Sequence, residues 1–184
     1  MNKGITAPAL NESDRIFIND TKSDRRLDVS STVSIIVQRP RSAVFNWFVP
    51  VESPGILLGF GPLPGVVAKS GQTGPWEKPG SRRTVHLKDG TTAREEVTAC
   101  ESPRYFAYRV SGFTNAFRAL TDEAEGQWWF EEAGDSTEVN WKSTFHARSA
   151  LTRSLLIPMV KLLWNGYMRV GIQAVKRRAE REAL

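Results

Sequence analysis

Cysteine and histidine are scarce in this sequence, which holds one cysteine and two histidines among 184 residues. Cys100 has no partner for an internal disulfide, and Cys100, His86 and His146 together are too few for a four-ligand zinc site. We therefore expect no disulfide, no metal site and no cofactor. Cysteine usage of this kind is typical of a cytoplasmic protein, and that is the location we predict.

Long apolar runs are also lacking. Arg153, Lys161 and Arg169 interrupt the longest candidate, so no uncharged apolar stretch reaches the 18 residues of a membrane-spanning helix. The first residues, MNKGITAPALNESDR, contain no apolar core of a secretory signal. The sequence therefore predicts neither a transmembrane segment nor secretion.

Positive charge is in modest excess, with a net charge of +5, but most Lys and Arg residues are spread along the chain. The one dense cluster, Lys176-Arg177-Arg178, lies near the end of a predicted helix, where cations favour the negative end of the helix dipole. We therefore expect no nucleic-acid binding. A peripheral contact of this cluster with a membrane or an acidic protein stays open as an alternative function.

Tryptophan, by contrast, is abundant, with six residues, and large aromatic side chains either fill cores or line cavities. The length fits one domain with a substantial core. We expect a polar, partly ordered extension over Met1–Ser31, in which Phe17 packs on the domain, and a ligand-binding domain over 32–184. The oligomeric state is left open.

Alternating apolar residues predict seven strands, which short turns join into an antiparallel meander. Helical spacing predicts a short helix after the first strand, a second short helix or turn up to Leu58, a glycine-rich loop over Gly59–Gly65 and a long C-terminal helix over Ala150–Leu184. The predicted strands span 33–38, 66–69, 82–87, 91–101, 104–110, 123–132 and 137–146.

The C-terminal helix has an unusually wide apolar face. With Pro158 placed at a helix start, polar residues form one stripe and apolar residues fill roughly 200° of the helical wheel, more than one flat sheet covers. A strongly twisted, curved sheet could cover such a helix. The polar stripe holds Lys161, Asn165, Arg169, Gln173 and Lys176.

The hairpin around Asp89-Gly90 predicts an inward-facing ion pair. A three-residue turn with a left-handed Gly90 sets Arg83 opposite Glu95 and unites the apolar residues of both strands on one face. Buried Arg–carboxylate pairs often lie where a polar ligand group is held, although a solvated pair at the sheet end is the alternative. The same alternation turns Trp129, Lys142 and His146 outward.

The element order and a diffuse motif pattern resemble the START/Bet v 1-like helix-grip superfamily, and within it the bacterial polyketide cyclase/dehydrase and lipid-transport group. The motif residues are the segment Gly74–Val85, the turn Asp89-Gly90, the run Glu95, Val97 and Pro103, and the strand residues Gly126, Trp128 and Phe130. The resemblance implies an α+β helix-grip fold, with a seven-stranded curved antiparallel sheet around the long C-terminal helix and two short helices after the first strand. It also implies a cavity between sheet and helix that takes a lipid, quinone, polyketide or aromatic molecule.

The candidate ligand-binding residues are those that the strand alternation turns inward, together with residues on the apolar face of the C-terminal helix. Gly166 and Gly171 would leave room on the helix either for a close sheet or for a guest molecule. The candidates are Arg83, Val85, Glu95, Val97, Phe106, Tyr108, Trp128, Phe130, Trp141, Phe145, Leu163, Gly166, Tyr167 and Val170.

Binding or transport is the preferred function, and cyclase or dehydratase chemistry is the alternative. In that alternative Glu95 is the candidate general base, with Arg83, Tyr108 or Tyr105 as hydrogen-bond donors. No G-x-S-x-G motif and no phosphate-binding loop is present. A module that binds a protein or a membrane is a second alternative.

Overall fold

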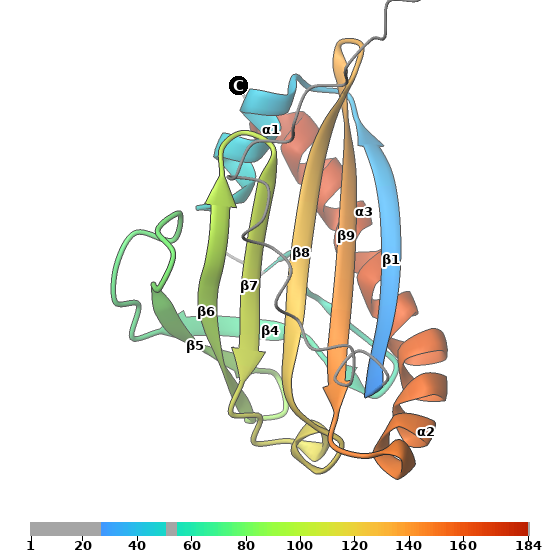
Figure 1. Ribbon diagram of the computed structural model, residues 1–184. Coiled ribbons are helices and arrows are strands. Elements are labelled where there is room, and N and C mark those ends of the chain that lie inside the picture. The colour runs from blue at the N-terminus through green and yellow to red at the C-terminus, as the bar shows by residue number, and fades with distance from the viewer. Residues whose placement is uncertain (1–26, 51–54, 184) are drawn as a thin grey trace, which may run out of the picture.

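A seven-stranded antiparallel sheet forms most of the molecule (Figure 1). The computed structural model describes residues 27–50 and 55–183. The spatial order is β1-β9-β8-β7-β6-β5-β4, so the first and last strands pair and the rest follow the chain. The strands are β1 (Asp28–Val37), β4 (Val66–Ser70), β5 (Arg82–Leu87), β6 (Thr92–Glu101), β7 (Tyr105–Ser111), β8 (Thr121–Ala133) and β9 (Ser136–Ala147).

Strand β1 begins earlier than the sequence predicts. It takes in Asp28 to Ser31, which belong to the predicted extension, and it pairs with β9 from Asp28↔His146 onward. The remainder of the extension, including Phe17, lies outside the described residues.

The hairpin between β5 and β6 has the predicted register. Arg83 lies opposite Glu95 and Val85 opposite Ala93. Gly90 has a φ of +82°, and its N–H donates to the carbonyl oxygen of Leu87 at 3.0 Å. A left-handed residue at this position favours glycine, which explains why the turn forms here.

The segment between α1 (Arg41–Phe48) and β4 differs from the prediction in two ways. Its described part, Gly55–Leu58, is a turn and contains no second helix. The glycine-rich stretch predicted as a loop instead holds a small hairpin of β2 (Gly59–Phe60) and β3 (Leu63–Pro64).

One long helical segment runs from α2 (Ala150–Pro158) through η4 (Met159–Trp164) to α3 (Asn165–Glu182). Ser149 caps it, because its hydroxyl accepts from the N–H of Thr152 and the Thr152 hydroxyl accepts from the N–H of Ser149. The placement of Pro158 at a helix start is therefore wrong. Proline lacks an N–H and crowds the preceding turn, so it is uncommon inside a helix, and here the π-helical turn η4 follows it directly.

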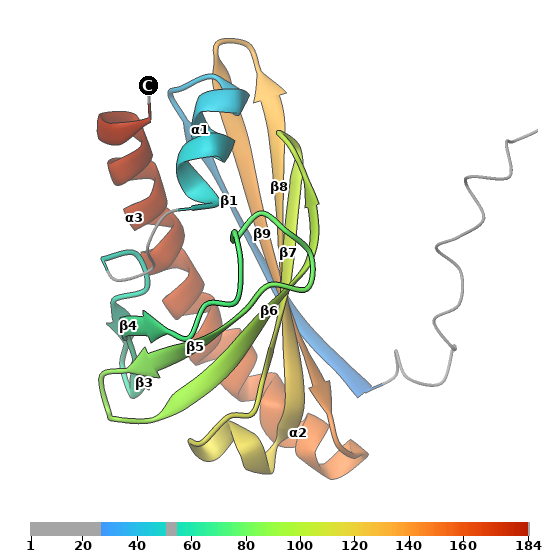
Figure 2. The ribbon, with the colours of Figure 1, turned by 90° about the vertical axis from the view of Figure 1, so that its left-hand side faces the viewer.

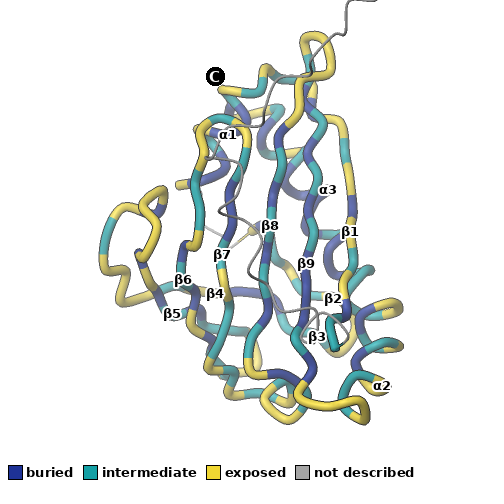
Figure 3. The backbone as a smooth tube through the Cα atoms, viewed as in Figure 1, coloured by how far each residue is buried: buried dark blue, intermediate teal, exposed yellow. Residues whose placement is uncertain are grey.

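The sheet curves around this helical segment. Figure 2 shows α1 and α3 on the same side of the sheet, with β4 and β5 bending beneath α3. Inward residues alternate with outward ones along the strands, and the backbone trace in Figure 3 shows this alternation of burial. A larger core cluster joins α1, α3 and the sheet, and a smaller one joins α2, η4, β1, β8 and β9.

Candidate functional site

A cavity of about 90 Å³ lies between the sheet and the C-terminal helical segment. Its walls are mostly apolar, and they come from the β2–β3 hairpin, from the strands, from the segment that holds η3 (Ala116–Ala119) and from the helix. The candidate residues that line this cavity are Val85, Glu95, Tyr108, Trp141, Phe145 and Tyr167.

A second cavity of about 40 Å³ adjoins the first on the side of α1. Leu57, Glu95 and Tyr108 line both cavities and therefore form the boundary between them. The other candidate residues that line the second cavity are Arg83, Phe106 and Trp128.

Five candidate residues line neither cavity. Val97 and Phe130 are 1% exposed and belong to the packed core. Gly166 is covered by Phe60, because a Cβ at this position would lie 2.3 Å from Phe60 Cε1. Leu163 and Val170 are half-buried positions of the helical segment outside the cavity walls.

Gly171 also packs against protein rather than bordering a cavity. A Cβ there would contact Leu57 Cδ2 at 3.2 Å and Trp141 Cζ3 at 3.3 Å. The sequence left open whether Gly166 and Gly171 make room for a close sheet or for a guest molecule. The structure shows close packing against protein at both glycines.

Arg83 and Glu95 form a buried ion pair on the concave face of the sheet. Arg83 Nε donates to Glu95 Oε2 at 2.8 Å, and the two side chains are 6% and 10% exposed. The guanidinium carbon lies 3.4 Å from the ring centroid of Trp76, so an aromatic face covers the cation. The alternative of a solvated pair at the sheet end is therefore wrong.

The second oxygen of Glu95 is the chemically available group of this pair. Within the described part of the chain, Oε1 makes no hydrogen bond, while Oε2 is bound to Arg83. Glu95 lines both cavities, so an acceptor oxygen is available at their boundary.

Two tyrosines near Glu95 remain protonated donors. Burial, and then the charge of Glu95, raise the pKa of Tyr108 above its usual range, and the same two causes raise the pKa of Tyr167. The Tyr108 ring, which keeps some accessible surface along the cavities, lies over Gly126. A Cβ at Gly126 would be 2.4 Å from Tyr108 Cζ, so glycine is required for this placement.

Stacked aromatic pairs form much of the remaining wall. Trp128 and Trp141 stack with ring centroids 4.5 Å apart and an interplanar angle of 11°, and Trp164 stacks on Tyr167 at 4.8 Å and 12°. The indole N–H groups of Trp141 and Trp164 are buried, and neither has a hydrogen-bond partner among the described residues. These are two unsatisfied donors on residues that line the main cavity.

Some residues that line the two cavities are not among the ligand-binding residues that the sequence predicts. Phe113 and Phe117 belong to a segment whose aromatic spacing already indicates inward side chains, and Phe117 stacks on Phe145. Trp76 lies in a segment without strand or helix periodicity, and Leu57 lies in a short segment expected to be a helix or a turn, so no pattern gives the direction of either side chain. Trp164 is on the predicted apolar helix face but was not among the candidates.

Several other titratable residues lie away from the cavities. Tyr105 packs against Trp129 with tilted rings and accepts from Gln127 on the outer face, so the prediction that it could be a donor at the site is wrong. Burial raises the pKa of the half-buried Cys100 thiol. His146 faces outward as predicted, with Nδ1 2.8 Å from Asp28 Oδ1.

The C-terminal basic cluster is largely engaged within the chain. Lys176 pairs with Glu180 at 2.8 Å and donates to the carbonyl oxygen of Ile36, and Arg178 pairs with Glu182 at 3.1 Å. In the described residues no group of His, Cys, Asp and Glu could hold a metal ion, and no described helix is long and apolar enough to cross a membrane.

Known proteins give independent comparisons. Residues 28–180 match the family model described as polyketide cyclase / dehydrase and lipid transport. No curated protein matches the chain. Among solved structures, major latex-like protein 151 from Panax ginseng has a TM-score of 0.62 and 16% identity, covering 86% of this chain and 99% of its own.

Two further solved structures share the fold at low sequence identity. A Thalictrum norcoclaurine synthase point mutant has a TM-score of 0.62 and 10% identity, covering 84% of this chain and 95% of its own. The protein XoxI from Bacillus cereus has a TM-score of 0.56 and 16% identity, covering 81% and 94%. With a family match over most of its length, the chain belongs to the polyketide cyclase/dehydrase and lipid-transport family, and it has the helix-grip fold.

Proposed function

We propose that this protein binds an apolar small molecule that carries a hydrogen-bonding group, and that Glu95 recognises this group. The observation that carries the proposal is a buried carboxylate at the boundary of two apolar cavities, held by Arg83 through only one of its oxygens. A hydrogen bond to a charged acceptor is stronger than one between neutral groups. A ligand hydroxyl that donates to Oε1 therefore gains affinity over the same ligand with a methyl group.

The donors around the main cavity favour a ligand that also has a carbonyl oxygen. Tyr108 and Tyr167 line this cavity and stay protonated. The indole N–H groups of Trp141 and Trp164 have no partner but are fully buried, so a ligand reaches them only if the wall moves. An aromatic or quinone-like molecule with a hydroxyl and a carbonyl group would satisfy both kinds of protein group. The family description, which names polyketides and lipids, includes molecules of this chemistry.

The size of the cavity limits what can bind without movement. Its volume of about 90 Å³ is well below the roughly 300 Å³ at the lower end of sites for drug-sized ligands. A ligand larger than about one ring must therefore displace the wall, either at Phe113 and Phe117 or at the β2–β3 hairpin. Transport of a larger lipid would need the same displacement.

Cyclase or dehydratase chemistry is a second candidate. Its supporting observation is the proximity of a carboxylate to a protonated phenol, since the charge of Glu95 contributes to the raised pKa of Tyr108. Glu95 is tied to Arg83, however, and this arrangement favours binding over proton abstraction. Turnover of a polyketide mimic would establish the second candidate.

Calorimetric titration with p-cresol and p-xylene tests the binding proposal, because the two ligands have the same shape and differ in a hydroxyl group. We expect p-cresol to bind about tenfold more tightly, as for one hydrogen bond to a charged group. The double substitution Arg83→Met/Glu95→Leu should abolish this preference and leave p-xylene binding.

The adjacent outer pair provides the matched control. Arg82→Met/Glu96→Leu changes the same residue types on the same strands, and it should keep the preference for p-cresol. Equal affinity of the unmodified protein for both ligands, or a preference that survives Arg83→Met/Glu95→Leu, would overturn the proposal. Native mass spectrometry of protein from its own host would then identify the larger natural ligand.

A further inference from the structure

An exposed apolar ridge runs along the first part of the C-terminal helical segment. Leu151, Leu155, Pro158 and Leu162 follow one another at intervals of four, three and four residues, so they lie on one helix face. The three leucines are 73%, 54% and 71% exposed, and all four residues are exposed to solvent. Leu156 and Val160, on the opposite face, are fully buried and already provide the contact with the core.

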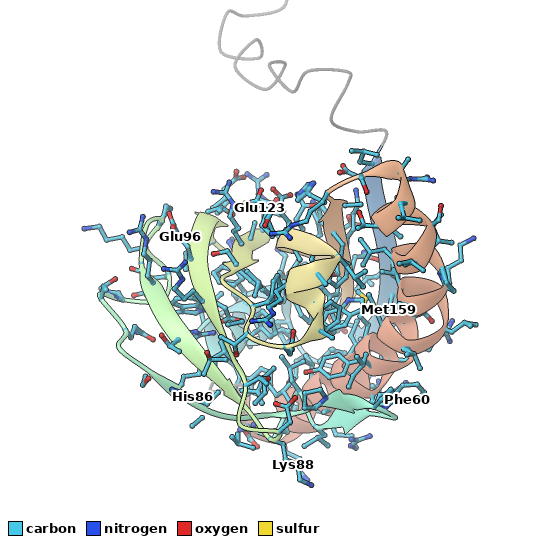
Figure 4. The ribbon with its side chains drawn as sticks, turned by 90° about the horizontal axis from the view of Figure 1, so that it is seen from below. Phe60, His86, Lys88, Glu96, Glu123 and Met159 are labelled. Carbon is cyan, nitrogen blue, oxygen red and sulfur yellow. The ribbon has the colours of Figure 1, made fainter. Side chains whose placement is uncertain are left out.

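The ridge continues onto the hairpin that covers the cavity. The next position in the series, four residues after Leu162, is Gly166, and Phe60 packs directly on it. Phe60 is itself 38% exposed, and Figure 4 shows it on the hairpin beside the C-terminal helix. Leu63 and Pro64 of the same hairpin line the main cavity. We call Leu151, Leu155, Pro158, Leu162 and Phe60 the apolar ridge.

The chain that carries the ridge is basic throughout. From Val139 to Ala179 the sequence contains no Asp or Glu and eight Lys or Arg residues. Lys161 and Arg169 are exposed beside the ridge, and Arg118 is exposed on η3, at the same end of the molecule as α2 (Figures 1 and 2). Of the acidic groups nearby, Asp122 pairs with Arg148, whereas Asp89, which accepts from Thr91, keeps its negative charge.

We propose that the apolar ridge docks on the surface of an anionic lipid bilayer. Exposed leucines flanked by Lys and Arg match the chemistry of a helix that lies in a membrane interface. Charge complementarity selects this occupant over a second copy of the chain, because a symmetric dimer through the ridge would bring two sets of cations together. Docking would place the β2–β3 hairpin, and so one wall of the cavity, against the lipid.

Co-sedimentation of the full chain with vesicles tests this proposal. We expect binding to vesicles of phosphatidylcholine with about 30% phosphatidylserine and much weaker binding to pure phosphatidylcholine, with a dependence on salt. Leu151→Ser/Leu155→Ser/Leu162→Ser should lower the affinity at least tenfold, given the apolar area that three leucines bury. Lys161→Glu/Arg169→Glu should remove the preference for anionic vesicles.

Matched control variants lie elsewhere on the surface. Ile36→Ser removes an exposed apolar residue from β1, and Arg177→Glu reverses an exposed charge near the end of α3, and both should leave vesicle binding unchanged. All these positions are exposed or only peripherally packed, and circular dichroism verifies that each variant folds.

Three results would overturn the proposal. The first is no binding to anionic vesicles, and the second is binding that the leucine substitutions do not change. The third is a concentration-dependent dimer that the leucine substitutions abolish, which would assign the ridge to a second copy of the chain. The inference is independent of the ligand site, because vesicle binding does not require an occupied cavity.

Discussion

Strands β5 and β6 carry two ion pairs of the same residue types on opposite faces of the sheet. Arg82 Nε lies 2.8 Å from Glu96 Oε2, and Arg83 Nε lies 2.8 Å from Glu95 Oε2. The outer side chains are 68% and 35% exposed, whereas the inner ones are 6% and 10% exposed. The same ion-pair distance therefore belongs to a solvent-screened surface pair on one face and to a desolvated pair at the cavities on the other. The face of the sheet, rather than the residue types, determines whether the pair is exposed to water.

The largest expected effect is the loss of one partner of the inner pair. Arg83→Ala leaves the Glu95 carboxylate buried without its counterion and should lower the free energy of unfolding by about 3–5 kcal/mol. Arg82→Ala on the outer face should change it by about 0–1 kcal/mol. Urea denaturation of both variants measures the difference.

The double substitution Arg83→Met/Glu95→Leu sharpens this comparison. An apolar pair of similar volume avoids the desolvation cost, so the double variant should be much more stable than Arg83→Ala. Similar losses in Arg82→Ala and Arg83→Ala would show that burial does not distinguish the two faces.

An intermediate effect is expected from the inner glycine of β8. The Ala side chain in Gly126→Ala would collide with the Tyr108 ring, and such overpacking costs about 1–3 kcal/mol. Glu131→Ala, at an exposed position of the same strand, should be near neutral. Thermal denaturation checks both variants.

A double-mutant cycle identifies the cause of the Gly126 effect. In a Tyr108→Ala background the ring is gone, so Gly126→Ala should cost much less than in the unmodified chain. An unchanged cost would attribute the effect to the strand backbone instead of the contact.

The smallest effect concerns His146 on the outer face. Glu125, with a carboxylate oxygen 3.8 Å from Nε2, and Asp28, at 2.8 Å from Nδ1, raise the pKa of His146 to about 9. The folded-state value lies above the unfolded one, so protonation stabilises the fold fully below about pH 6.5, and this contribution is lost as the pH rises through 9. The side chain is 33% exposed and its distance to Glu125 is too long for a hydrogen bond, which limits the contribution to about 1 kcal/mol.

Stability curves at pH 6 and pH 9.5 measure the His146 contribution. The unmodified chain should lose about 1 kcal/mol more between these values than His146→Gln, which cannot titrate. Parallel losses in the two proteins would refute the assignment.

The sheet could be predicted from the sequence because strand and turn rules act locally. Alternation along Val139–Phe145 gives the inward set, and the left-handed requirement at Gly90 fixes the register that pairs Arg83 with Glu95. The buried ion pair follows from that register. These features depend on neighbouring residues and a period of two, which a sequence displays directly.

The helix and the cavity walls depend on contacts that no local pattern contains. The helix continues through Pro158 and includes a π-helical turn directly after it, and the rules for helix starts and ends predict neither feature. Phe60 meets Gly166, and Trp76 covers Arg83, across long separations in the sequence and from segments without periodicity. The cavity is the space that these contacts leave unfilled, so its walls cannot be read from local patterns. Gly166 and Val97, which were predicted to line the cavity, instead pack against other residues of the protein.

The stacked tryptophans of the sheet have an optical consequence. With ring centroids 4.5 Å apart and planes 11° from parallel, Trp128 and Trp141 are close enough for their excited states to couple, so they absorb and emit as a pair. Trp141 borders the larger cavity and Trp128 the smaller one. Any change of either ring's position alters the coupling, and the protein therefore carries its own spectroscopic reporter for events on both sides of Glu95.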